Sequence, residues 1–214
     1  MVSGETFLTT NLLPSDLPRP YPLYPMKKIV VMGSGNGSNF QAIAEYIRNN
    51  GLPIEIVAMI TDNPKAFIIE RAKNLGIPAR VLDYKAIGDK DLYNKMLLDL
   101  LNELGPDLVV LAGYMRILPP EIVKAFERRI VNIHPSLLPS FPGLHGIEQA
   151  WSYGVKVTGV TVHFVDEGVD TGPIIDQVPV RIEEGDTLET LEKKIHEAEH
   201  ELYPRVIARI LLGN

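Results

Sequence analysis

The chain has 214 residues, of which 45% are hydrophobic, and a formal net charge of −6 at pH 7. This length fits one ordinary domain with a substantial core, and the acidic balance argues against a positive field for a nucleic-acid partner. The absence of cysteine excludes a disulfide framework, a thiolate nucleophile and Cys-ligated zinc, and the lack of any uncharged apolar run of about 18 residues predicts no membrane span.

Residues 1–25 contain five prolines, with Tyr21 and Tyr24 between them, and lack the features of a secretory signal. We therefore expect a proline-rich, disordered or surface-draped extension over 1–25, a single folded domain over 26–214 and a cytoplasmic location. A transit peptide is the alternative, which Glu5, Asp16 and the shortage of arginine disfavour.

From Lys27 onwards, short β-branched runs alternate with amphipathic helical patterns. The predicted strands are 27–32, 54–60, 79–82, 107–112 and 129–133, and the predicted helices are 39–50, 64–75, 89–104 and 120–126. The apolar residues of the third helix recur at helical spacing, which predicts a core-facing side made of Leu92, Met96, Leu100 and Leu104. The uniformly apolar strand 107–112 is expected to be central in a parallel sheet.

Two later strand-like runs, 155–165 and 173–182, have no helix between them and are predicted to pair antiparallel. A final helix is predicted from Thr187, introduced by a capping box of Asp186 and Glu189. The whole pattern predicts an α/β, Rossmann-like fold: a doubly wound, mostly parallel sheet with an antiparallel strand pair near the C-terminal end. Functional groups in such sheets gather at the carboxyl ends of the strands.

A glycine-rich segment, Gly33-Ser-Gly-Asn-Gly-Ser-Asn39, follows the first strand and opens the first helix. Glycines permit a tight turn and close approach of a ligand, and a helix N-terminus offers unpaired N–H groups to a phosphate. The acid expected about 20 residues further on in a dinucleotide site is not clearly placed. The segment predicts phosphate binding of some kind, with a simple tight turn as the alternative, and does not distinguish a nucleotide from a sugar phosphate.

Asn132 and His134 stand two residues apart at the end of a predicted strand, before a loop stiffened by three prolines. Period-two alternation puts both side chains on the same side of the strand. An amide donor beside an imidazole suits stabilisation of an oxyanion together with proton transfer. A hydrogen-bonded structural histidine is the alternative.

The turn over 165–173 is rich in acidic residues, and such turns are usually solvated. If one of its carboxylates faced His134, it would favour the protonated imidazole and order a water molecule.

The segment His196-Glu-Ala-Glu-His200 matches zinc-protease patterns. We predict no metal site, because both histidines should face solvent, opposite the apolar stripe of the final helix, and no histidine follows them. Glu199 lies at the edge of that stripe, where a partly buried carboxylate could reach a ligand.

Together with Leu111-Ala-Gly-Tyr-Met-Arg-Ile-Leu118, Asn132-Ile-His-Pro-Ser-Leu-Leu-Pro139 and Asp170-Thr-Gly-Pro173, these motifs resemble the folate-dependent formyltransferase family from about Ile29 to Ile207. Within the family, the resemblance points to the branch that formylates glycinamide ribonucleotide. It implies the formyltransferase fold and transfer of a formyl group from 10-formyltetrahydrofolate to the substrate amine in purine biosynthesis. It also implies no metal, nucleic-acid or membrane partner, and either a monomer or a homodimer.

The resemblance also assigns residues by position. Asn132, His134 and Asp170 match the catalytic trio, in which the first two would stabilise the oxyanion and the third would fix a water that relays the proton. The implied substrate-binding residues are Gly37, Ser38, Asn39, Pro135 and Glu199. The implied folate-binding residues are Lys90, Met115, Arg116, Ile117, Leu118, Asn132, Asp166, Glu167, Gly168, Val169 and Asp170. Lys90 falls where many relatives have arginine, and its cation could attract a glutamate carboxylate without bidentate geometry.

Other functions stay open on the sequence. A 10-formyltetrahydrofolate deformylase or a methionyl-tRNA formyltransferase uses the same donor, but those enzymes carry additional domains that we do not expect here. A nicotinamide dehydrogenase leaves the Asn132–His134 pair unexplained. A noncatalytic phosphate-binding module predicts that changing the trio alters ligand affinity alone.

Overall fold

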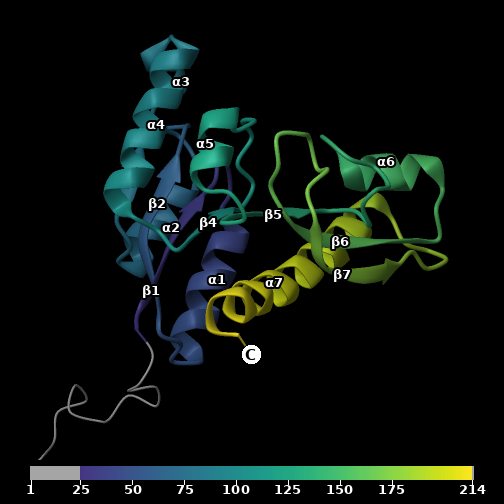
Figure 1. Ribbon diagram of the computed structural model, residues 1–214. Coiled ribbons are helices and arrows are strands. Elements are labelled where there is room, and N and C mark those ends of the chain that lie inside the picture. Colours follow the sequence, from purple (N-terminus) through teal and green to yellow (C-terminus); the bar gives the residue numbers. More distant parts are fainter. Residues whose placement is uncertain (1–24, 214) are drawn as a thin grey trace, which may run out of the picture.

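The computed structural model describes residues 25–213, so the prediction for the proline-rich start falls almost entirely outside the described residues. Seven strands form one sheet in the order β3-β2-β1-β4-β5-β6-β7 (Figure 1). The strands are β1 (Lys27–Met32), β2 (Ile54–Thr61), β3 (Ala79–Val81), β4 (Leu108–Leu111), β5 (Ile130–His134), β6 (Val157–Phe164) and β7 (Ile174–Arg181). β1 to β5 are parallel, whereas β6 is antiparallel to β5 and β7 is antiparallel to β6. The predicted mixed sheet is confirmed.

Helices cover both faces of the sheet. They are α1 (Ser38–Asn49), α2 (Ile68–Leu75), α3 (Tyr84–Ile87), α4 (Lys90–Leu104), α5 (Pro120–Ala125), α6 (Gly146–Tyr153) and α7 (Leu188–Leu212). Side chains alternate along β1, so that Ile29 and Val31 pack in one core with α1 and α7, while Val30 and Met32 pack in a second core with α4 and α5. Within residues 25–213, no helix combines the length and the apolar character needed to cross a membrane.

Strand β4 occupies the middle of the sheet, between β1 and β5, and all four of its residues are buried. A strand covered on both faces has no polar side, which is why its sequence is uniformly apolar. The prediction of a central strand is confirmed, and it brings the segment after Leu111 to the carboxyl edge of the sheet.

The predicted core-facing side of α4 is wrong for its first two residues, whereas Leu100 and Leu104 do pack against the second core. Leu92 and Met96 are 49% and 39% exposed, whereas Tyr93, Leu97 and Leu101 are buried. The helix carries two series of apolar residues, offset by one position. The series that contains Tyr93 packs inward, because the ring and the hydroxyl of Tyr93 contact other residues of the core. The Tyr93 hydroxyl lies 2.5 Å from the hydroxyl of Tyr114.

Two predicted helix starts are corrected. The first turn of the helix predicted over 64–75 is not helical, because the Asn63 side chain accepts a hydrogen bond from the Lys65 N–H at 3.0 Å and forms a separate turn before α2. At the start of α7, the capping box consists of Thr187 and Thr190 rather than Asp186 and Glu189. The short helices α3 and α6 were not predicted.

Tyr203 ties helix α7 to the middle of the sheet. Its side chain is fully buried, and its hydroxyl lies 2.8 Å from the carbonyl oxygen of Leu111 on β4 and 3.1 Å from that of Val131 on β5. The single hydroxyl proton is thus shared between two strands at the edge where functional groups are expected. This contact fixes the position of α7 relative to the ends of both strands.

We expect Tyr203→Phe to lower the free energy of unfolding by about 1–3 kcal/mol, because two buried carbonyl groups each lose one hydrogen-bond donor. Urea denaturation of the variant and the wild type measures the difference. Tyr153→Phe is the matched control, since Tyr153 is 80% exposed and its hydroxyl has water available. Equal unfolding midpoints for Tyr203→Phe and wild type would show that the hydroxyl contributes nothing.

Candidate active site

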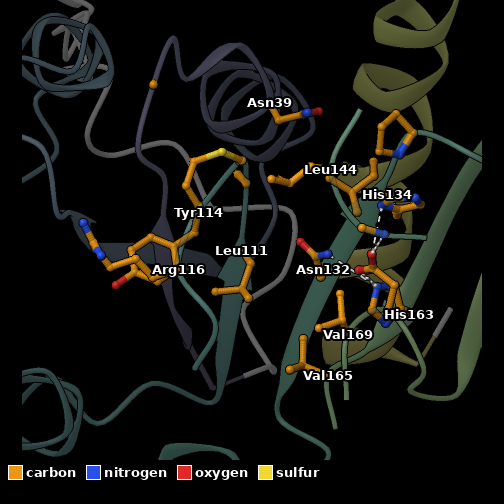
Figure 2. Close-up of a pocket in the computed structure, with 18 of the residues that line it drawn as sticks. Asn39, Leu111, Tyr114, Arg116, Asn132, His134, Leu144, His163, Val165 and Val169 are labelled. Atoms are coloured by element: carbon orange, nitrogen blue, oxygen red, sulfur yellow. Dashed lines mark hydrogen bonds and ion pairs between the residues drawn. The ribbon is translucent and has the colours of Figure 1, made fainter. Parts of the chain in front are cut away.

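A cavity of about 560 Å³ opens at the carboxyl ends of β1, β4 and β5 (Figure 2). Its walls come from the start of α1, the segment after β4, the end of β5, the 163–170 turn and one side of α7. Figure 2 shows Asn132, His134 and His163 gathered on one side of it, with Tyr114 and Arg116 lying apart from them. The functional groups therefore lie at the carboxyl ends of the parallel strands, as this sheet topology predicts.

The glycine-rich segment forms the wall at the start of α1. Gly37 is the residue before the helix and has φ 78°, and a Cβ there would come within 2.7 Å of the Ile68 Cβ. Both the backbone conformation and the contact require glycine. The first intrahelical bond runs from the Gln41 N–H to the Gly37 carbonyl, which leaves the N–H groups of Ser38 and Asn39 without helical partners. This wall is suited to an anion.

Asn132, His134 and Asp170 converge, although Asp170 lies 36 residues beyond His134 in the chain. The His134 Nδ1 is 3.4 Å from the Asp170 Oδ2. The other ring nitrogen, Nε2, donates to the carbonyl of Phe141 at 2.7 Å. The Nε2 edge of the imidazole is thus held by a hydrogen bond, and the edge bearing Nδ1 faces the carboxylate at a longer distance.

A second imidazole, that of His163, completes this cluster and was missed by sequence reasoning. Its Nε2 lies 3.5 Å from the Asp170 Oδ1 and 3.4 Å from the Asn132 Nδ2, while its Nδ1 donates to the Phe164 carbonyl at 2.8 Å. His163 stands opposite Asn132 in the antiparallel pairing of β5 with β6. The sequence did show a histidine inside a strand predicted to be antiparallel. Which residue lies opposite this histidine depends on the register between the two strands, and the sequence alone does not determine that register.

The pKa of Asp170 is lowered from its ordinary value of 3.8. Burial alone would raise it, but the hydrogen bond to His163, the Gly143 N–H and the charges of the two imidazoles together outweigh burial. The Gly143 N–H donates to the Asp170 Oδ2 at 2.7 Å. The carboxylate is therefore held in its charged form beside His134.

Part of the cavity wall is apolar. Met115, Ile117, Leu144 and Val169 line it and are each at least half exposed, although such side chains are usually buried. Apolar side chains left open around a concave site are typical of a wall that receives a ligand.

Arg116 stands at the same wall and is held from two directions. Its Nε donates to the Asp62 Oδ2 at 2.7 Å, and its guanidinium carbon lies 3.3 Å from the centre of the Tyr84 ring. The ion pair and the ring together fix the course of the segment that follows β4.

Glu199 reaches the cavity from α7, as predicted for a carboxylate at the edge of the apolar stripe. It is 5% exposed, and its Oε2 accepts from the Asn39 Nδ2 at 3.1 Å and from the His196 Nδ1 at 2.9 Å. The prediction that both histidines of the motif face solvent holds for His196, which is exposed and also lines the cavity, and is wrong for His200, which is half-buried. The apolar stripe correctly predicted which side of α7 packs on the core. It did not predict which neighbouring side of the helix borders the cavity.

Most of the other predicted binding residues line the cavity: Ser38, Pro135, Leu118, Asp166 and Gly168. Lys90 and Glu167 lie elsewhere among the described residues. Lys90 is exposed as the first residue of α4, and Glu167 pairs with Lys124 at 3.6 Å. Their folate contacts stay predictions. Among residues 25–213, no group of three or more His, Asp or Glu side chains is arranged to hold a metal ion.

Comparison with known proteins gives a consistent result. A family model described as Formyl transferase matches residues 27–207. The chain is 45% identical over 186 residues to the phosphoribosylglycinamide formyltransferase of Bacillus subtilis (strain 168), covering 87% of this chain and 95% of that protein. It is 41% identical over 180 residues to the protein of the same name in Escherichia coli (strain K12), covering 84% and 85%. The crystal structure of phosphoribosylglycinamide formyltransferase from Bacillus halodurans is similar with a TM-score of 0.83 and 52% identity, covering 87% of this chain and 96% of that one.

We expect the Asp170 carboxyl to titrate below 3.8 in the folded chain, as measured by ¹³C NMR, and near 3.8 in the chain unfolded in urea. A pKa lowered by folding adds stability above the unfolded value, and this contribution is lost as the pH falls through the folded value. Asp170→Asn should therefore show a smaller loss of stability on acidification below about pH 4 than wild type. A folded-state pKa at or above 3.8 would contradict the assignment.

Proposed function

Because this chain belongs to the formyl transferase family, we propose that it transfers the formyl group of 10-formyltetrahydrofolate to the terminal amine of glycinamide ribonucleotide, a step of purine biosynthesis. The names of the relatives support this choice of donor and acceptor. The observation that carries it is the convergence of Asn132, His134 and Asp170 in a cavity that has an anion-binding wall and an apolar wall.

The phosphorylated acceptor fits the wall at the start of α1. The N–H groups of Ser38 and Asn39 and the close turn at Gly37 would hold its phosphate. Glu199 has one oxygen, Oε2, engaged by Asn39 and His196, which leaves Oε1 for a ribose hydroxyl. These contacts would direct the acceptor amine toward Asn132 and His134.

The formylated folate fits the opposite wall. A pterin is flat, largely apolar on its faces and polar at its edge, and the exposed side chains of Met115, Ile117 and Val169 offer matching surfaces. The backbone of the 166–170 turn supplies polar groups for the edge. In this arrangement the formyl carbon lies between the two walls, next to the cluster of Asn132, His134 and Asp170.

The reaction then needs no covalent enzyme intermediate. The neutral amine attacks the formyl carbon, a new C–N bond forms, and the carbonyl oxygen takes up negative charge. Asn132 donates an N–H to this oxygen, and the Nδ1–H of protonated His134 supplies the second donor, because the Nε2–H is engaged by Phe141. The bond from the carbon to N10 of the folate then breaks.

Asp170 and His163 prepare the proton transfer. The charged Asp170 faces His134 and can hold a water molecule that carries the proton from the attacking amine to N10. His163 lies against the second oxygen of the same carboxylate and against the Asn132 amide. It thereby orients two members of the trio.

The activity is tested by incubating the purified chain with 10-formyltetrahydrofolate in the presence and absence of glycinamide ribonucleotide. We expect tetrahydrofolate to form only with the acceptor present, in equal amount to formylated acceptor. Release of free formate without the acceptor would identify a hydrolase instead. Tight binding of a nicotinamide dinucleotide without formyl transfer would support a dehydrogenase.

We expect Asn132→Ala to reduce kcat by about 100- to 1000-fold, the usual effect of removing one oxyanion donor. His134→Ala and Asp170→Asn should also reduce kcat severely, because each removes a group from the same cluster. Steady-state kinetics with circular dichroism as a check on folding gives the measurement. A variant that folds and keeps wild-type turnover would remove its residue from the proposed trio.

A further inference from the structure

His134, Thr161 and Gln177 form a row across three neighbouring strands. Strands β5, β6 and β7 lie side by side at one end of the sheet (Figure 1). Thr161 on β6 stands opposite His134 on β5 and opposite Gln177 on β7. Residues directly opposite in antiparallel strands project from the same face of the sheet. The row therefore leads from a member of the proposed trio to the edge strand. Among the residues that the structure describes, neither Thr161 nor Gln177 lines the cavity.

The side-chain amide of Gln177 has a hydrogen-bond partner for each of its two protons. Its Nε2 lies 2.9 Å from the Thr161 Oγ1 and 3.0 Å from the carbonyl oxygen of Leu138. The Thr161 hydroxyl in turn donates to the Ser136 carbonyl at 2.7 Å and accepts the Leu138 N–H at 3.0 Å. Because Thr161 is fully buried, no bulk water is at hand to replace a lost partner. Gln177 and Thr161 thus hold the backbone at Ser136 and Leu138.

The backbone held in this way belongs to the prolyl loop, residues 135–143, which follows β5. A second contact seats the same loop on the sheet. Leu137 packs over Gly159 of β6, where a Cβ would come within 2.6 Å of the Leu137 Cδ2. Because Gly159 has no side chain, the loop can lie directly against the strand. The first part of the prolyl loop therefore has a fixed position on β6.

The later part of the prolyl loop reaches the proposed trio at two points. The Phe141 carbonyl accepts from the His134 Nε2 at 2.7 Å, and the Gly143 N–H donates to the Asp170 Oδ2 at 2.7 Å. The Ser136 hydroxyl also lies 3.3 Å from the Phe141 carbonyl oxygen, which links the first part of the loop to the later part. The orientation of the imidazole and the placement of the carboxylate therefore depend on where the loop lies.

We propose that Gln177 is a positioning residue for formyl transfer. Its amide fixes the prolyl loop through Leu138 and Thr161, and the loop presents the Phe141 carbonyl that orients His134. In this role Gln177 contacts neither substrate, and it affects the rate of the reaction through His134 rather than the binding of either substrate. The inference rests on the proposed function and adds to it a residue of the edge strand.

The first test measures kcat and both KM values for Gln177→Met. Methionine is unbranched and similar in length to glutamine, but it donates no hydrogen bond. We expect kcat to fall by about 10- to 100-fold, because a displacement of about 1 Å at a reacting group can cost about 100-fold in rate. KM for glycinamide ribonucleotide and for 10-formyltetrahydrofolate should change by less than about threefold. An unchanged kcat would overturn the proposal.

Asp176→Asn is the matched control. Asp176 is the preceding residue of β7, and its carboxylate pairs with Arg209 of α7 at 3.0 Å, on the other face of the sheet. This variant should keep the wild-type kcat. A purely structural role for Gln177 predicts a lower unfolding midpoint in urea with the same kcat per folded molecule, so the two measurements separate the roles. If Gln177→Met does not fold, Gln177→Asn takes its place, because its shorter side chain cannot reach both partners, and the same loss of kcat is expected.

The second test asks whether Gln177 acts through His134. In the His134→Ala background, Gln177→Met should lower kcat by less than about threefold, because the group that it positions is absent. Effects of the two substitutions that simply multiply would show that Gln177 acts elsewhere.

A third measurement needs no turnover. In ¹H–¹⁵N spectra of wild type, we expect a signal from the His134 Nε2–H, which its hydrogen bond to Phe141 protects from exchange with water. This signal should broaden or vanish in Gln177→Met. The His163 Nδ1–H is bonded to the Phe164 carbonyl and should give the same signal in both proteins. An unchanged His134 signal in the variant would contradict the proposal.

Failure of this inference can be told apart from failure of the proposed function. If wild type and Gln177→Met transfer the formyl group to the ribonucleotide equally fast, the inference alone is wrong. If wild type transfers no formyl group, the proposed function is wrong, and the His134 signal still shows whether Gln177 fixes the imidazole.

Discussion

The carboxylate of Asp170 is the point at which several separate segments of the chain meet. Its Oδ2 accepts the Gly143 N–H and faces His134 on β5, and its Oδ1 faces His163 on β6. A charge this well enclosed is stable only while its partners stay in place, so the prolyl loop, the two strands and the acidic turn are positioned together. The geometry of Asn132, the nearest amide, follows from this arrangement through its contact with His163.

Much of the fold could be predicted because it depends on patterns that repeat along the chain. Uniform apolar character placed β4 at the centre of the sheet, and alternation placed Asn132 and His134 on one side of β5. The prediction was wrong where two patterns competed within a few residues. On α4, the series with Leu92 and the series with Tyr93 have the same period, and the one that packs inward has partners from distant segments, among them the Tyr114 hydroxyl.

The site was predictable where chemistry is concentrated in short motifs, and less so where it depends on pairing between distant segments. The resemblance to a family supplied Asp170, because the residues of the acidic turn alone are typical of a solvated loop. His163 comes from the register of β5 against β6, and His196 from the flank along which α7 meets α1. Neither position could be predicted from the local sequence, because both depend on how whole strands and helices pack against one another.

The bridge made by Tyr203 has a mechanical consequence. Glu199 lies about one helical turn before Tyr203 on α7, and the tyrosine hydroxyl joins that helix to the backbone of both β4 and β5. This contact couples the position of the Glu199 carboxylate on α7 to that of Asn132 and His134 on β5.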